Sequence, residues 1–214
     1  MNFDPIELEV FKNIFISIAE EMGMVLGRTA FSPNIKERKD FSCALFDRKG
    51  ETFAQGAHIP VHLGAMSLSV QSALKKVEMG PDDTVILNNP YEGGTHLPDI
   101  TCISPLFINN KPLFFIANRA HHSDVGGITP GSMPLATSIF QEGIIIPPLK
   151  IISKGKINEE VLHLILTNVR TPEEREGDLK AQLAANEIGK ERLKEVIEKY
   201  GLEKILKYTE HLKY

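Results

Sequence analysis

The chain has 214 residues, of which 42% are hydrophobic and 24% charged, the composition of an ordinary globular protein. Its formal net charge is −4, with both signs spread along the sequence, so neither nucleic acid nor an anionic membrane is expected as a partner. No apolar run approaches the ~20 residues that a membrane span needs. Met1 leads into no signal-peptide pattern, so we expect a cytoplasmic protein.

A helix is predicted over about residues 5–28. Asp4 can cap this helix, and Pro5 suits its first turn. Apolar residues recur at steps of three or four along the segment, which predicts a single buried face. That face consists of Ile6, Val10, Phe11, Ile14, Ile18, Met22 and Val25.

Residues 40–155 are predicted to be rich in strands and loops. Alternating runs bounded by turn residues indicate two hairpins, with a helix and a further strand between them. The expected strands cover about residues 41–46, 51–54, 84–87, 101–108 and 113–118, and the helix covers 64–79. Cys43 and Cys102 lie far apart in this region, and we expect both to be small buried side chains in a reducing compartment.

Residues 158–214 have the apolar spacing of helices, interrupted at Thr171-Pro172 and at Gly201. The predicted fold class is therefore α+β. It has an N-terminal helix within residues 1–30, a central mixed β-rich region with long loops, and a C-terminal helical region. We expect these parts to form one unit without internal repeats.

Histidines provide the strongest chemical signal in the sequence. Five of the seven lie in the central region: His58, His62, His96, His121 and His122. His58 and His62 have HxxxH spacing, but Pro60 between them argues against a helix. Their role is either to line a site or purely structural.

His96 and Asp99 lie three residues apart on a bent loop after a predicted strand. Gly93-Gly94 permits backbone angles that other residues resist, and Pro98 excludes a helix interior, so both side chains can converge on one ion. An imidazole and a carboxylate suit zinc, manganese or iron. The alternative, favoured by this segment alone, is a His–Asp hydrogen bond that fixes the loop.

His121, His122 and Asp124 follow the next predicted strand. In an extended chain the two histidines point to opposite faces, and His122 shares a face with Asp124. One histidine is expected to join His96 and Asp99, which leaves metal positions open for substrate and suits Lewis-acid catalysis. The other histidine or Asp124 is expected to orient a ligand or move protons. The alternative is a buried polar network without metal.

Other catalytic patterns are missing from the sequence. Ser42 and Cys43 have no obvious base beside them, so nucleophilic catalysis is not expected. No GxxxxGK[ST] loop occurs, and the paired glycines do not fit a dinucleotide fingerprint. The chain alone therefore gives no sign of binding ATP.

Five segments, in order along the chain, resemble the hydantoinase B family. They are Asp40-Phe-Ser-Cys-Ala44, His58-Ile-Pro-Val-His-Leu-Gly64, Asn89-Pro-Tyr-Glu-Gly-Gly-Thr-His-Leu-Pro-Asp99, Ala120-His-His-Ser-Asp-Val-Gly-Gly127 and Asn168-Val-Arg-Thr-Pro-Glu-Glu-Arg-Glu-Gly-Asp178. That family includes the B subunit of N-methylhydantoinase, the C-terminal part of 5-oxoprolinase and the alpha subunit of acetone carboxylase.

The resemblance implies an enzyme component that acts on a small molecule together with a hydantoinase-A-type subunit. That partner would bind ATP and activate the substrate. The resemblance also implies a manganese ion held by His96, Asp99 and His121, with zinc as the alternative metal. His122 and Asp124 are then the expected catalytic residues.

Family B subunits are much longer than this chain, so the resemblance covers an N-terminal portion, and a second polypeptide is expected to complete the subunit. The predicted function is a metal-assisted step in an ATP-dependent hydrolase of cyclic amides, of the hydantoinase or 5-oxoprolinase type. One alternative is a carboxylase subunit of the acetone carboxylase type. Another is a non-catalytic assembly subunit of a split enzyme.

Overall fold

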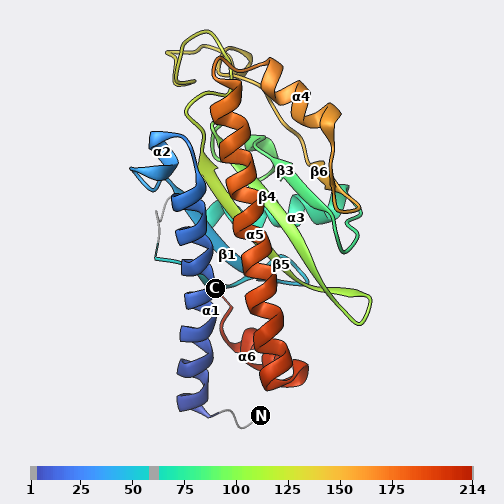
Figure 1. The fold of residues 1–214 in the computed structure, drawn as a ribbon. Coiled ribbons are helices and arrows are strands. Elements are labelled where there is room, and N and C mark those ends of the chain that lie inside the picture. The colour runs from blue at the N-terminus through green and yellow to red at the C-terminus, as the bar shows by residue number, and fades with distance from the viewer. Residues whose placement is uncertain (1–3, 58–62, 214) are drawn as a thin grey trace.

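One antiparallel sheet organises the molecule, with helices on both of its faces (Figure 1). The computed structural model describes residues 4–57 and 63–213. The strand order is β2-β1-β5-β4-β3-β6-β7. The long helices α1 (Pro5–Thr29) and α5 (Pro172–Tyr200) cover one face, and α3 (Leu63–Lys76) lies against the other. The predicted α+β class is confirmed.

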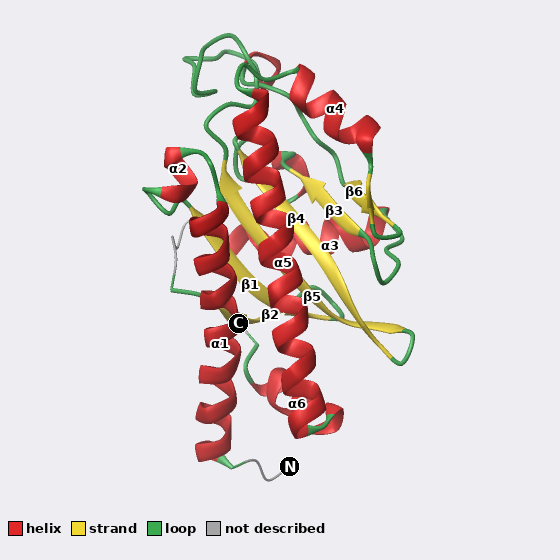
Figure 2. Ribbon diagram, in the orientation of Figure 1, coloured by secondary structure: helices red, strands yellow, loops and turns green. Residues whose placement is uncertain are grey.

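The strands match the two predicted hairpins and add an edge that the sequence did not indicate (Figure 2). They are β1 (Phe41–Asp47), β2 (Thr52–Gln55), β3 (Thr84–Leu87), β4 (Asp99–Ile108), β5 (Lys111–His121), β6 (Leu149–Ser153) and β7 (Lys156–Ile157). The tight β4–β5 turn uses Asn109 and Asn110 at φ values of +52° and +61°, which asparagine tolerates better than most residues.

The remaining elements are short or lie near the C-terminus. They are α2 (Pro33–Lys36), the 3-10 helices η2 (Pro90–Glu92) and η3 (Ile139–Gln141), α4 (Glu159–Thr167) and α6 (Leu202–His211). Proline at 172 and glycine at 201 bound α5, as the sequence predicts. Among the described residues, no helix is long and apolar enough to cross a membrane.

Helix α1 begins as predicted, and its predicted face is buried in part: Phe11, Ile18 and Met22 are at most 4% exposed. The Ile6 amide donates to Asp4 Oδ1 at 2.8 Å, which caps the first turn. Ile6 and Val10, expected on the buried face, are 76% and 49% exposed. Phe15 and Leu26 are fully buried instead, because α1 packs against both α5 and the β1–β2 hairpin.

Strand pairing determines which side chains share a face of the sheet. Asp99 lies opposite His121, and Thr101 lies opposite Arg119. Directly paired residues point to the same face, so these four share the α3 face. The opposite face carries the two free cysteines, Cys43 and Cys102, which are fully buried as predicted; burial raises the pKa of both thiols.

Candidate metal centre

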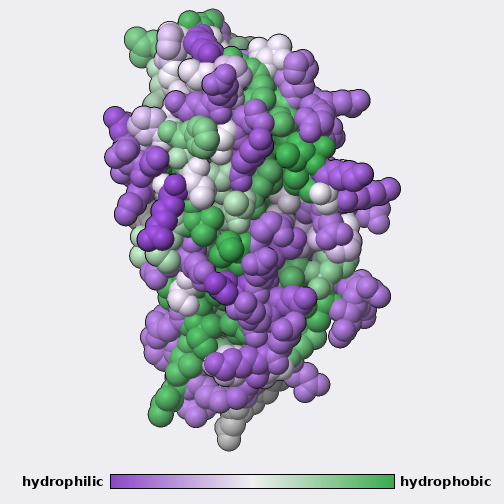
Figure 3. Space-filling view, viewed as in Figure 1, coloured by the Kyte–Doolittle hydropathy of each residue, from purple (hydrophilic) through white to green (hydrophobic). Residues whose placement is uncertain are grey.

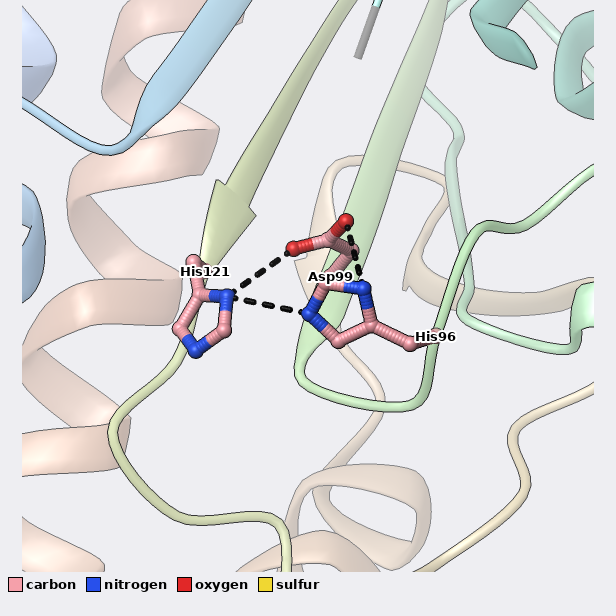
Figure 4. A group of neighbouring side chains, drawn as sticks. All are labelled: His96, Asp99 and His121. Carbon is pink, nitrogen blue, oxygen red and sulfur yellow. Dashed lines mark hydrogen bonds and ion pairs between the residues drawn. The ribbon is translucent and has the colours of Figure 1, made fainter. Parts of the chain in front are cut away.

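Three predicted side chains meet where β4 begins and β5 ends (Figure 4). His96 comes from the loop after η2, Asp99 is the first residue of β4, and His121 is the last residue of β5. His96 Nε2 lies 3.1 Å from His121 Nδ1. The Asp99 carboxylate contacts both rings, with Oδ2 3.4 Å from His96 Nδ1 and Oδ1 3.3 Å from His121 Nδ1.

Local geometry explains why the three side chains converge. Antiparallel pairing places Asp99 and His121 directly opposite each other on neighbouring strands. A tight turn then brings His96 back over β4, closed by the Asp99 amide donating to the His96 carbonyl at 3.0 Å. One strand pair and one turn therefore bring the His96 loop and the end of β5 to the same point.

The centre is buried at its base and open on one side. Asp99 is fully buried and His121 is 8% exposed, whereas the side chain of His96 is 41% exposed. The Thr95 hydroxyl donates to Asp99 Oδ2. A second carboxylate oxygen, Asp40 Oδ2, lies 4.0 Å from His121 Nδ1. His96 is therefore the most exposed of the three side chains and forms the open side of the centre.

The donor set fits a divalent transition metal. Within residues 4–57 and 63–213, these three form the one group of at least three His, Cys, Asp or Glu side chains whose ligand atoms lie within 4.8 Å of one another. Two imidazoles and a carboxylate are ligands that zinc, manganese and iron accept, and they leave coordination positions for water or substrate. A buried carboxylate also gains from a nearby cation, which offsets its desolvation.

Arg119 places a fixed positive charge beneath the centre. Its guanidinium is fully buried on the same face of the sheet as Asp99. Burial lowers the pKa of Arg119 to about 10, and the negative charge of Asp99 opposes that shift. Arginine has no lone pair for a metal, so Arg119 can act on the centre only through its neighbours.

His122 lies on the opposite face of the sheet, under α5. Its Nε2 is 2.9 Å from Gln182 Oε1, while the Gln182 amide donates to the Ile100 carbonyl and to Asn118 Oδ1. Because the amide orientation is fixed, Nε2 carries the imidazole proton. Burial, and then the positive charge of Arg175, lower the pKa of His122 to about 4, so the ring is neutral at pH 7.

Asp124 fastens the loop that follows β5 to the segment before α5. Its carboxylate accepts hydrogen bonds from the Arg170 backbone amide at 2.6 Å and from the Arg170 guanidinium at 2.8 Å. The Ser132 hydroxyl donates to the same carboxylate at 3.1 Å. Of the five predicted site residues, the structure brings together His96, Asp99 and His121 and directs His122 and Asp124 to other contacts.

A shallow hollow of about 200 Å³ borders the open side of the centre. It is lined by His96, Pro98, Ser132, Met133, Pro134 and Glu142. The same loop exposes large apolar side chains: Met133 is 73%, Phe140 is 82% and Leu135 is fully exposed. Apolar surface is visible at this end of the molecule (Figure 3).

Sequence reasoning missed the residues that hold the His96 loop in place. Arg119, Ser69 and Asn88 are fully buried, and their side chains all donate hydrogen bonds to backbone carbonyls of this loop. Strand alternation offered one signal, since Arg119 lies two residues before His121 and therefore shares its face. The predicted roles of His58 and His62 lie outside the described residues.

Comparison with known proteins agrees with the resemblance in the sequence. The family model for hydantoinase B/oxoprolinase matches residues 4–214. An uncharacterised protein of Methanocaldococcus jannaschii is 51% identical over 92% of this chain and 36% of its own length. The 5-oxoprolinase 1 of Arabidopsis thaliana is 44% identical over 98% of this chain and 18% of its own length.

Two solved structures share the fold. The ATP-dependent caprolactamase from Pseudomonas jessenii is 32% identical, with a TM-score of 0.90 over 99% of this chain and 37% of its own. An acetone carboxylase superposes with a TM-score of 0.91 at 20% identity, over 96% of this chain and 28% of its own.

The chain belongs to the hydantoinase B/oxoprolinase family. It spans about a third of the Methanocaldococcus protein and less than a fifth of the plant 5-oxoprolinase.

Proposed function

We propose that this chain is the metal-holding portion of a cytoplasmic, ATP-dependent hydrolase of cyclic amides. The observation that carries the proposal is the convergence of His96, Asp99 and His121 within a chain that matches the hydantoinase B/oxoprolinase family throughout. The names 5-oxoprolinase and caprolactamase both denote enzymes of cyclic amides. Ring opening of such an amide is therefore favoured over ketone carboxylation, for which the fold of acetone carboxylase alone gives no specific support.

In this proposal the three side chains hold one divalent ion, manganese or zinc, which would polarise a substrate carbonyl or activate water. Asp99 supplies a buried negative charge, and the two imidazoles supply neutral nitrogen ligands. The half-exposed His96 side chain leaves the approach to the centre open from the hollow beside Met133 and Pro134. A small cyclic amide would enter from that side.

Proton transfer by His122 or Asp124 stays a prediction. Their contacts support a different role, in which His122 fixes the end of β5 against α5 and Asp124 fixes the following loop. A neutral, fully buried imidazole is poorly placed to exchange protons with solvent. We therefore assign both residues a positioning role in the proposed enzyme.

Partner polypeptides are part of the proposal. ATP would be bound by a hydantoinase-A-type subunit, since the sequence contains no phosphate-binding loop. A second polypeptide would supply the family region that this chain does not span. The exposed Met133, Leu135 and Phe140 beside the centre support such a partner, because large apolar side chains clustered on one loop are typical of contact surfaces.

Metal analysis of purified protein tests the central step. Wild type is expected to bind about one manganese or zinc ion per chain, as a site with three protein ligands does. His96→Ala and Asp99→Ala should lose it. His163→Ala is the matched control, because His163 is an exposed residue on α4, far in sequence from the centre. Equal metal content in all four proteins would contradict the proposal.

A further inference from the structure

A hydrogen-bonded brace lies beneath the loop that carries His96. We name the brace by its residues, Arg119 and Ser69. The Arg119 guanidinium donates from one nitrogen to Ser69 Oγ at 2.7 Å and to the Gly93 carbonyl at 3.1 Å. Its Nε donates to Thr101 Oγ1 at 2.8 Å, which fixes the guanidinium against β4. The Arg119 side chain is therefore held by three elements at once.

Ser69 closes the brace from helix α3. Its hydroxyl donates to the Gly93 carbonyl at 2.7 Å and accepts a hydrogen bond from Arg119. Ser69 and Arg119 therefore both donate to the same backbone oxygen. Ser69 is fully buried, and its hydrogen bond with Arg119 is buried as well. Buried hydrogen bonds that share a charged donor are among the stronger ones in proteins.

Gly93 fits this place because it has no side chain. Its φ is +91°, and a Cβ there would lie 2.3 Å from the Ser69 nitrogen and 2.4 Å from the Leu68 carbonyl carbon. The loop backbone thus rests directly on α3. Any shift of α3 or of Arg119 moves the peptide three residues before His96.

The loop is held on the other side of His96 as well. The Asn88 side chain donates to the Leu97 carbonyl at 2.7 Å and to the Ile144 carbonyl at 2.9 Å. Asp99 is then fixed by pairing with His121. Between these fixed points, His96 is the half-exposed ligand whose position depends on the loop.

We infer that Arg119 and Ser69 are positioning residues of the metal centre, which set the place of His96 relative to Asp99 and His121. The inference rests on the proposed function. Neither residue ligates the ion or touches the reacting atoms. Their action passes through the Gly93 carbonyl, and losing it costs metal affinity because His96 must then be ordered at the moment of binding.

The test compares two serines on the same helix. Ser69→Ala removes the serine half of the brace, its hydrogen bonds with the Gly93 carbonyl and with Arg119, and leaves the Arg119 bond to Gly93. Ser67→Ala removes a partly buried hydrogen bond to Thr52 Oγ1 of 2.8 Å that does not involve the loop. Binding of Mn²⁺ alone is measured by isothermal titration calorimetry, and the thermal unfolding of the metal-free proteins is followed in parallel. Ser69→Ala should weaken Mn²⁺ binding about tenfold, the usual cost of losing an outer contact of a metal site, whereas Ser67→Ala should bind like wild type.

The outcomes are distinct. Wild-type affinity in Ser69→Ala, or equal weakening in both serine variants, overturns the positioning role. An absence of Mn²⁺ binding by wild type, or wild-type affinity in Asp99→Ala, overturns the proposed function and this inference with it. Arg119→Lys keeps the positive charge but cannot donate to Thr101, Ser69 and the Gly93 carbonyl at once. It should therefore weaken Mn²⁺ binding more than Ser69→Ala does. If Arg119→Lys fails to fold, the serine pair still decides.

Discussion

At the scale of residues, the ligand types of the centre were predictable and their surroundings were not. The spacing of His96 and Asp99, and the histidine pair after β5, indicated the donor set from the sequence alone. The resemblance implied His121 as the third ligand, and the pairing of Asp99 with His121 places that histidine, and not His122, beside the carboxylate. Pairing register depends on contacts across the whole sheet, and no local pattern contains it. The brace was missed for the same reason, because Ser69 and Arg119 lie 50 residues apart.

Gly93→Ala tests the close approach of the loop to α3. A methyl group at this position meets backbone atoms of Ser69 and Leu68 that cannot move aside without shifting the helix. Gly131→Ala is the control, with a φ of +81° and nothing within 4 Å of the added Cβ. The control should lose about 1–2 kcal/mol of unfolding free energy, from backbone strain alone. Gly93→Ala should lose roughly 2 kcal/mol more, from overpacking.

Chemical denaturation measures both unfolding free energies. The Gly93 prediction fails if the two alanine variants are equally stable.

At the scale of elements, helix starts and hairpins followed from the sequence, and the buried face of α1 followed only in part. Asp4-Pro5 and Thr171-Pro172 begin α1 and α5 where predicted. The apolar pattern of α1 was ambiguous because its N-terminal turns carry apolar side chains on more than one side. Ile6 and Val10 lie outward, while Phe15 lies inward against Phe53 of β2. Strands β6 and β7 are short and half-buried, so they lack a clear alternating pattern.

A buried aspartate joins α5 to the start of α2. Asp178 is fully buried, accepts hydrogen bonds from the amides of Phe31 and Ser32 at 2.8 and 3.0 Å, and pairs with the Arg175 guanidinium at 2.9 Å. Asp178→Ala leaves a buried guanidinium and two amides without this partner. We expect a loss of about 3 kcal/mol or more in the free energy of unfolding.

Glu187→Ala on the same helix is the comparison for this prediction. Glu187 pairs with Lys190 at the surface, where its side chain is 56% exposed. Removing such a pair should cost about 1 kcal/mol or less. Urea denaturation of both variants gives the difference, and a similar small loss in each would show that Asp178 does not hold the two helices together.

At the scale of the whole molecule, the described residues form one seven-stranded sheet with a core on each face, and the chain spans about a third of the length of the Methanocaldococcus relative. The candidate centre lies at one end of the sheet, beside a loop whose apolar side chains have no cover within the described residues. The sequence predicted that the chain matches only a portion of a family B subunit, because family B subunits are much longer. It did not predict that the exposed apolar loop and the open side of the centre adjoin.

Activity should therefore require partner polypeptides. The purified chain, loaded with Mn²⁺ or Zn²⁺, is expected to hydrolyse neither ATP nor a cyclic amide such as 5-oxoproline. Adding a hydantoinase-A-type subunit and the remaining B-type region should produce hydrolysis of both. Turnover by the chain alone, measured as phosphate release and ring opening, would contradict the need for partners.

The most direct test of the metal centre is an anomalous difference map from a crystal of the chain soaked in a manganese or zinc salt. We expect one strong peak about 2.0–2.2 Å from a nitrogen of His96, a nitrogen of His121 and an oxygen of Asp99, the distances typical of zinc and these ligands. A map with no peak between these three side chains, or with the ion bound only elsewhere, would contradict it.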